Sequence, residues 1–227
     1  HEVPGCDITV LSNDPALTTK TYGVAAADRR KIKDIWKALG RADLLVSGGG
    51  SLLQDVTSKN SPIYYLGIFF MAKLRRNPVV IYGQGLGPLN SKRNRTLVKW
   101  AFNHVRAIHV RDDESYELVR ELGVKDPVQV APDPVLGIDG DVVDSEKGRH
   151  ILEGLGYDSA RPLALIALRD WANTNYVHEF AALGDALVEQ GYSVGLLAMH
   201  HDQDETISKA VCAHMRGGAF VIADAYD

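Results

Sequence analysis

One stretch of the chain, residues 42–55, constrains the fold more than any other. Its apolar run, Leu44–Val46, is continuous rather than alternating, which is typical of a strand buried in a parallel sheet. Three glycines, Gly48–Gly50, and then Ser51 follow at once. A strand, a glycine turn and a polar helix N-cap would direct backbone N–H groups at a phosphate or carboxylate, so we predict an anion-binding corner. A tight turn that only joins a strand to a helix is the alternative.

Short apolar runs alternate with amphipathic segments along the whole chain. The expected strands are residues 8–12, 44–46, 78–82, 107–111, 128–130, 163–168, 193–199 and 219–223. The expected helices include residues 32–39, 63–74, 93–105, 114–122, 146–155, 176–190 and 204–215. This alternation predicts an α/β fold with parallel sheets and right-handed crossovers. Because Gly- and Asp-rich residues 137–148 separate two such series, we expect two Rossmann-like domains that face a cleft, residues 1–140 and residues 141–227.

Composition excludes several classes of protein. The formal charge of −4 argues against a nucleic-acid binder, which would carry a basic stripe. Cys6 and Cys212 match no metal spacing and indicate a reducing compartment, and the longest apolar stretch, residues 62–74, is too short to span a bilayer. We therefore expect a cytoplasmic protein, which could work at the inner face of the cell membrane. The chain starts at His1 and stops at Asp227 directly after a predicted strand, so we expect that both ends of a longer protein are missing.

Two arginines follow predicted strands, at the sheet edge where open α/β folds bind ligands. Arg111 ends a strand and offers a planar fork of donors that suits a carboxylate or phosphate. The alternative is an arginine that forms a salt bridge with Asp112 or Asp133. Arg169 occupies the same relative place in the second series, and Trp171 could stack on a sugar face or cap the core. Two arginines from two domains would suit a small polyanion.

Four further residues belong to the expected cleft. Gln84 and Gly85 lie in a glycine-rich turn after an apolar strand, so we expect the Gln84 amide to be exposed at the cleft floor as a hydrogen-bonding group. Gln54 and Asp55 follow the first glycine turn. Asp55 could act as a base, although an acid at such a position more often caps a helix.

Two polar clusters have plainer interpretations. In residues 200–204, adjacent histidines point in different directions and no third ligand follows at helical spacing, so we expect no metal site and favour a single histidine as a general acid. The basic row Lys92, Arg93, Arg95 and Lys99 is most simply a solvated helix face. It could also make a weak contact with anionic lipid head groups.

Several blocks of the sequence resemble a known family. They are "ADLLVSGGGSLLQDVTS", "YYLG", "VIYGQGLGPL", "VRDDESYELVRELGV" and "APDP". In this order, over most of residues 7–136, they are similar to polysaccharide pyruvyl transferases, above all to the bacterial CsaB type. The second half is more loosely similar, through "LALIALRDW" and "GYSVGLLAMHHDQDE".

The resemblance implies a GT-B-like pair of domains and a specific reaction. The family transfers the enolpyruvyl group of phosphoenolpyruvate to a sugar. The CsaB type forms a 4,6-pyruvate ketal on N-acetylmannosamine of a lipid-linked precursor of the secondary cell-wall polysaccharide, a glycan that anchors S-layers. Arg111 falls where the family places an arginine that holds phosphoenolpyruvate, and we expect Gly48, Gly49, Gly50, Ser51 and Arg169 to bind the same donor. The family's late "RLHA"-like motif is absent, so its catalytic histidine is expected beyond residue 227. No metal or redox cofactor is required.

Two other functions fit the same pattern. A GT-B glycosyltransferase that uses a nucleotide sugar shares the architecture, because a fold does not fix a function. It predicts binding of a nucleoside diphosphate instead of phosphoenolpyruvate. A non-catalytic sugar- or anion-binding module would show no turnover with either donor. The acceptor, the ring positions modified and the oligomeric state do not follow from the residues.

Overall fold

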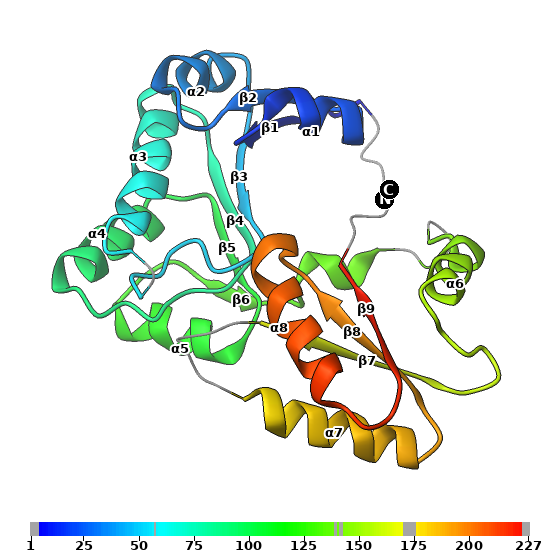
Figure 1. Cartoon of the computed structure of the whole chain (residues 1–227). Coiled ribbons are helices and arrows are strands. Elements are labelled where there is room, and N and C mark those ends of the chain that lie inside the picture. The colour runs from blue at the N-terminus through cyan, green and yellow to red at the C-terminus, as the bar shows by residue number, and fades with distance from the viewer. Residues whose placement is uncertain (1–4, 57, 139, 141–142, 170–175, 224–227) are drawn as a thin grey trace. The chain divides into compact units, whose positions relative to one another are not determined.

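The computed structural model divides the chain into two compact units, His1–Ile138 and Asp139–Asp227 (Figure 1). The residues that it describes are 5–56, 58–138, 140, 143–169 and 176–223, with the side chains of 201–203 excepted. Both units are mixed α/β with parallel strands, which is consistent with the predicted Rossmann-like fold. That the two units face a common cleft stays a prediction. No helix in the described ranges is long and apolar enough to cross a membrane.

Unit 1, the first of these, contains a two-stranded and a four-stranded parallel sheet, with strand orders β1-β2 and β3-β4-β5-β6. Its strands are β1 (Thr9–Ser12), β2 (Ala25–Asp28), β3 (Leu45–Gly48), β4 (Val79–Gln84), β5 (Ala107–Val110) and β6 (Val128–Val130). Its helices are α1 (Pro15–Tyr22), α2 (Ile32–Leu39), α3 (Ser61–Leu74), α4 (Lys92–Phe102), α5 (Asp113–Glu121) and the short 3-10 turn η1 (Pro134–Gly137).

Local signals in the sequence explain where several helices begin. Asp14 caps α1, where Pro15 is the first helical residue, and its Oδ1 accepts a 3.0 Å hydrogen bond from Leu17 N. Asp112 caps α5 in the same way, because its Oδ1 accepts a 2.8 Å bond from Ser115 N. The predicted helix over residues 32–39 is confirmed as α2. Its apolar positions bury one stripe against the core.

The core of unit 1 lies on one face of the four-stranded sheet. Each strand pairs with the one before it in sequence, and right-handed crossovers between such strands place their helices on the same side. Buried side chains of α3, α4 and α5 accordingly form one cluster with inward-facing residues of β4 and β5. Phe102 of α4 is 1% exposed in this cluster, a burial worth about 1.5–3 kcal/mol. On the other face Val46 and Tyr82 are about half exposed.

Two features of unit 1 differ from the sequence predictions. Strand β2 was not predicted, because its Ala25, Ala26 and Ala27 lack the branched or aromatic side chains typical of strands. It forms by parallel pairing with β1. The predicted helix cap at Ser51 is also wrong. After the glycine turn the chain runs on to Leu53, which bridges Leu86, and helix α3 begins only at residue 61.

Unit 2, the second of the two, has a three-stranded parallel sheet in the order β7-β8-β9. Its elements are α6 (Ser145–Gly154), β7 (Leu163–Leu168), α7 (Val177–Glu189), β8 (Ser193–Ala198), α8 (His201–His214) and β9 (Ala219–Ile222). All six were predicted, with bounds that differ by three residues at most. A second apolar cluster joins β7 and β8 to α7 and α8. Asp185 of α7 stabilises the turn before β9, because its carboxylate accepts bonds from Arg216 N and Gly217 N at 2.8 and 2.9 Å.

Candidate functional site

The glycine turn after β3 and the end of β4 lie side by side at the carboxyl edge of the four-stranded sheet. Gly85 N donates a 2.9 Å hydrogen bond to Gly50 O, and Gly87 N donates a 2.9 Å bond to Leu53 O. Gly49 and Gly50 both have positive φ, 73° and 56°, so this turn requires residues without a Cβ atom. The structure thus brings the two predicted turns together at one sheet edge, although helix α3, which follows the first turn in sequence, begins only at residue 61.

Arg111 reaches this edge from the end of β5. Its Nη2 donates a 3.1 Å hydrogen bond to Ser51 Oγ in the glycine turn. It also meets two carboxylates: Nε lies 3.3 Å from Asp112 Oδ2, and Nη1 lies 3.5 Å from Asp133 Oδ2. The Arg111 side chain is 34% exposed, and such partly exposed pairs are worth only about 0–1 kcal/mol each. The pairs therefore orient Arg111 more than they stabilise the fold.

A glycine at position 85 makes the contact between Arg111 and Ser51 possible. A Cβ atom at Gly85 would lie 2.7 Å from Ser51 Oγ and 2.9 Å from Arg111 Nε, closer than real Cβ contacts. Any other residue would push the guanidinium or the hydroxyl aside. The glycine is thus required for close approach, and it leaves the Arg111 fork beside the glycine turn.

The net charge of the cluster formed by Arg111, Asp112 and Asp133 limits which ligands it can bind without further residues. Burial acts to raise the pKa of Asp112. Hydrogen bonds from the Ser115 hydroxyl and N–H, together with Arg111, outweigh burial and hold that pKa below its usual range. Asp133 caps η1 through a 3.1 Å bond from Val135 N. With both acids ionised, one guanidinium between two carboxylates has a net charge of −1. A polyanion at this edge therefore needs a second cation or must displace a carboxylate.

Gln84 does not lie where the sequence analysis placed it. Its side chain is buried, 1% exposed, because β4 extends two residues further than predicted and β3 covers it. Ser47 Oγ donates a 2.9 Å bond to Gln84 Oε1, whereas the buried Nε2 has no hydrogen-bond partner among the residues that the structure describes. The expectation of an exposed amide is wrong. Gln84 is buried and contacts Ser47 at the end of β3, so it can support the site but cannot contact a ligand from the surface.

Asp55 has a structural environment. Its carboxylate, in a residue that is 6% exposed, accepts bonds from Asn90 N and Ser91 N, both 2.8 Å, and from Asn94 Nδ2 at 3.1 Å. Burial acts to raise the pKa of Asp55, but these bonds outweigh it and lower the pKa. Asp55 therefore stabilises the segment just before α4, whose N-cap is Ser91, so the helix-cap alternative is wrong and the geometry indicates a structural role. Gln54 Oε1 accepts a local 2.8 Å bond from Val56 N.

In unit 2, Arg169 follows β7 at the carboxyl edge of the three-stranded sheet. It lines a hollow of about 330 Å³ together with Leu168, Met199, His200 and Asp204. Asp204 is 1% exposed. Its Oδ2 accepts a 2.8 Å bond from His200 N, and its Oδ1 has no partner within the described ranges. That Arg169 and Arg111 meet on one ligand stays a prediction, and Trp171 lies outside the described residues.

One cationic residue was not among the sequence candidates. Arg29 follows β2, and its guanidinium lies 5.3 Å from the ring centre of Tyr64 and 5.8 Å from that of Tyr65. The Tyr64 hydroxyl donates to Arg29 O at 2.5 Å. The sequence shows the adjacent tyrosines, but Arg29 could be placed beside them only if strand β2 had been predicted, and it was not. Across the described ranges, no group of three or more His, Cys, Asp or Glu side chains could hold a metal ion.

The sequence of the chain matches the model of a known protein family. The model of polysaccharide pyruvyl transferases matches residues 2–213, which include the glycine turn, Arg111 and the edge of unit 2. The chain belongs to the polysaccharide pyruvyl transferase family. A search of curated proteins found no match. The family consists of transferases that act on polysaccharides, so the chain is assigned to pyruvyl transfer in general. The CsaB subtype stays a prediction.

Proposed function

We propose that the protein transfers the enolpyruvyl group of phosphoenolpyruvate to N-acetylmannosamine in a lipid-linked precursor of a cell-wall polysaccharide, with a 4,6-ketal as product. The observation that carries this proposal is the Arg111 fork beside the glycine turn, in a chain of the pyruvyl transferase family. A planar guanidinium suits the carboxylate or phosphate of this donor better than a point charge would. The resemblance of the glycine block to the CsaB type supports the acceptor.

The reaction proceeds through two additions at one carbon. A sugar hydroxyl oxygen attacks C2 of the enol while a proton is delivered to the C3 methylene, and a base takes the hydroxyl proton. The bond from C2 to the phosphate oxygen then breaks and its electron pair leaves with the phosphate. A second hydroxyl oxygen closes the ring on C2, and its proton passes to the departing phosphate. The products are the cyclic ketal and inorganic phosphate. Cationic groups stabilise the charge of the donor and of the departing phosphate.

The described residues supply part of these roles. Arg111 binds the donor at the glycine turn, and Ser51 Oγ, which already contacts the guanidinium, is placed to bond the same anion. Because the cluster of Arg111 with Asp112 and Asp133 is net negative, we favour a second cation, Arg169, over displacement of a carboxylate. Asp55 is enclosed by three donors, so the acid and base lie elsewhere. We assign them to groups outside the described residues.

Turnover with defined substrates tests the proposal. Full-length protein is incubated with phosphoenolpyruvate and a synthetic lipid-linked disaccharide that ends in N-acetylmannosamine. Phosphate release, together with a mass gain that matches a pyruvate ketal, is the expected result. Glycosyl transfer from a nucleotide sugar, without reaction of phosphoenolpyruvate, would assign the chain to the glycosyltransferases instead.

Arginine variants test the assignment of the donor site. We expect Arg111→Ala to lower kcat/KM for phosphoenolpyruvate at least tenfold, since charge-assisted bonds are worth about 1.5–3 kcal/mol. Arg111→Lys should restore little, because an ammonium cannot replace the fork. The matched control is Arg161→Ala, which removes a surface arginine paired with Asp158 at 3.2 Å in unit 2. Arg111→Ala with the donor kinetics of this control would reject the assignment.

A further inference from the structure

The positive charge of the chain is concentrated in one segment of unit 1. Residues 56–111 contain ten Lys or Arg residues and no Asp or Glu, although the whole chain has a formal charge of −4. The remaining residues carry fifteen Lys or Arg residues and all twenty-nine acids. This segment forms α3, β4, α4 and β5. One layer of the unit is therefore strongly cationic within an acidic protein.

Most of these cations have no carboxylate partner. Arg95 pairs with Glu121 at 2.7 Å, and Arg111 belongs to the site described above. The other eight have no carboxylate oxygen within 4.0 Å in the described part of the chain, and all are exposed. They are Lys59, Lys73, Arg75, Arg76, Lys92, Arg93, Lys99 and Arg106. Unpaired cations on one layer create a positive field that attracts an anionic surface.

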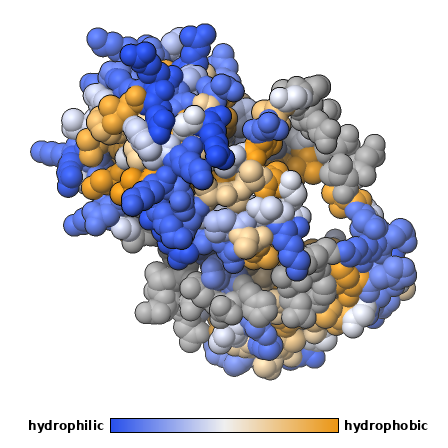
Figure 2. Space-filling model, turned by 90° about the horizontal axis from the view of Figure 1, so that it is seen from above, coloured by the Kyte–Doolittle hydropathy of each residue, from blue (hydrophilic) through white to orange (hydrophobic). Residues whose placement is uncertain are grey.

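Exposed apolar side chains lie among these cations. Phe70 and Leu74, on the outer side of α3, are 50% and 58% exposed, and Trp100 of α4 is 39% exposed. The Phe70 and Trp100 rings are 6.4 Å apart, and Lys73 Nζ lies 5.0 Å from the centre of the Trp100 ring. Figure 2 shows apolar residues at the surface among hydrophilic ones on the left of the view, the side of α3 and α4 in Figure 1. Helix α3 is apolar on nearly all sides, yet in the described part of the chain Phe70 and Leu74 remain half exposed or more.

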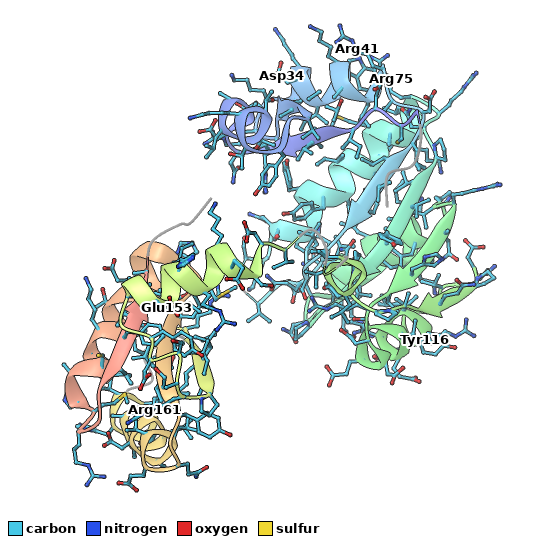
Figure 3. The ribbon with its side chains drawn as sticks, turned by 90° about the vertical axis from the view of Figure 1, so that its right-hand side faces the viewer. Asp34, Arg41, Arg75, Tyr116, Glu153 and Arg161 are labelled. Carbon is cyan, nitrogen blue, oxygen red and sulfur yellow. The ribbon has the colours of Figure 1, made fainter. Side chains whose placement is uncertain are left out.

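Two of these residues, Lys73 and Trp100, also border a hollow at the amino end of β4. It has a volume of about 210 Å³, and Lys73, Arg76, Trp100 and His104 line it together with apolar side chains. Arg75 extends the cationic surface toward α2, where its guanidinium lies 4.0 Å from the centre of the Trp36 ring. Figure 3 labels Arg75 close to Arg41 and Asp34 at this end of the unit. The mixture of aromatic rings and cations around a small hollow suits a phosphate group at an apolar boundary.

We propose that this surface, the α3–α4 face, docks unit 1 on a bilayer that contains anionic lipid. The face is defined by Phe70, Lys73, Leu74, Arg76, Trp100 and His104. Unpaired cations bind the phosphate head groups, and Phe70, Leu74 and Trp100 enter the interface. A soluble polyanion such as a nucleic acid would use the cations but would gain nothing from an exposed Phe and Leu. The apolar stripe therefore favours a bilayer as the partner.

Docking in this way leaves the candidate site accessible. The hollow lies at the amino end of β4, whereas the glycine turns lie at its carboxyl end. The strand is six residues long, so these ends are about 17 Å apart. Membrane binding and donor binding thus use separate surfaces. The inference does not rest on the proposed function.

Vesicle flotation with the full chain tests the proposal. We expect binding to vesicles of phosphatidylcholine with a quarter phosphatidylglycerol, weaker binding in 0.5 M salt, and little binding to pure phosphatidylcholine. Each cation near an anionic bilayer contributes about a fivefold gain in partitioning, so Lys73→Glu with Arg76→Glu should lower binding at least tenfold. Phe70→Gln with Leu74→Gln should also lower it about tenfold, because two half-exposed apolar side chains no longer enter the lipid.

Matched variants elsewhere in the chain are the controls. Leu17→Gln replaces a leucine of α1 that is as exposed as Leu74, and Lys147→Glu reverses an exposed charge of α6. Both should bind like the wild type, and circular dichroism should confirm that every variant is folded. Because the vesicles carry no glycan, this result is independent of turnover. Unchanged binding by the Phe70/Leu74 variant would overturn the proposal, as would binding to heparin without binding to vesicles.

Discussion

Replacement of Asp55 by Asn tests whether this acid is structural or catalytic. The carboxylate accepts three hydrogen bonds, two of them from the backbone N–H groups of Asn90 and Ser91 at the start of α4. Asn keeps one acceptor and turns the other oxygen into a donor, so at least one buried N–H loses its partner. A buried donor without a partner costs about 1–3 kcal/mol, and a bond to a charged acceptor contributes a similar amount, so we expect a loss of about 3 kcal/mol.

Urea unfolding of unit 1 measures this loss. Trp36 and Trp100 both lie in unit 1, so their fluorescence reports on that unit in a Trp171→Phe background. With a denaturant slope of about 2 kcal/mol per molar, the midpoint should fall by roughly 1–2 M. The control is Asp14→Asn, since Asn caps a helix about as well as Asp and the midpoint should barely move.

The pH dependence gives a second test of the same reasoning. The pKa of Asp55 is lowered in the folded protein, so its contribution is complete above the unfolded pKa of about 3.9 and is lost as the pH falls through the folded value. The gap between wild type and Asp55→Asn should therefore be widest above about pH 5 and should close below pH 4. A gap that is independent of pH, or a midpoint equal to that of Asp14→Asn, would refute the structural account. Loss of kcat in folded Asp55→Asn, with its stability intact, would indicate a base.

Two further predictions concern one residue in each unit. Gly85→Ala places a Cβ atom against Ser51 Oγ and Arg111 Nε, so kcat/KM for phosphoenolpyruvate should fall at least tenfold. The control is Gly67→Ala, whose added Cβ atom meets no other atom within 4 Å. Wild-type kinetics in Gly85→Ala would contradict the close approach. Asp185→Asn should lower the thermal midpoint of unit 2 at pH 7 but not near pH 3, because the Gly217 N–H bond above all lowers the pKa of Asp185. An equal loss at both pH values would mean that the charge is irrelevant.

The arrangement of elements in both units was largely predictable because the relevant signals are local. The continuous apolar run of residues 163–168 coincides with β7, and capping aspartates mark where α1 and α5 begin. Strand β2 escaped prediction because alanine has little preference for strands, and only its pairing with β1 makes it one. The units themselves could be anticipated from the repeated pattern, but no local signal tells how they face each other.

The sequence predicted which residues form the candidate site better than it predicted their burial and hydrogen bonds. The rule that ligands lie at the carboxyl ends of parallel strands selected Arg111 and the glycine turns, which the structure brings together. It could not show that Gln84 is buried beneath Ser47, because this depends on how far two strands extend and on which side chains face each other. The environment of Asp55 likewise depends on residues 35–39 positions away in the chain.

The sequential strand order of the larger sheet in unit 1 has a consequence for synthesis of the protein. Each strand from β4 to β6 pairs with the strand made just before it, so its partner already exists when it leaves the ribosome. Such neighbour pairing keeps contacts short in sequence, which favours rapid folding. The contact of Ser51 with Arg111 can form only after β5 has been made, and that of Arg111 with Asp133 only after β6 has been made. The corner formed by the glycine turn, Arg111 and Asp133 is therefore the last part of unit 1 to be completed as the nascent chain grows.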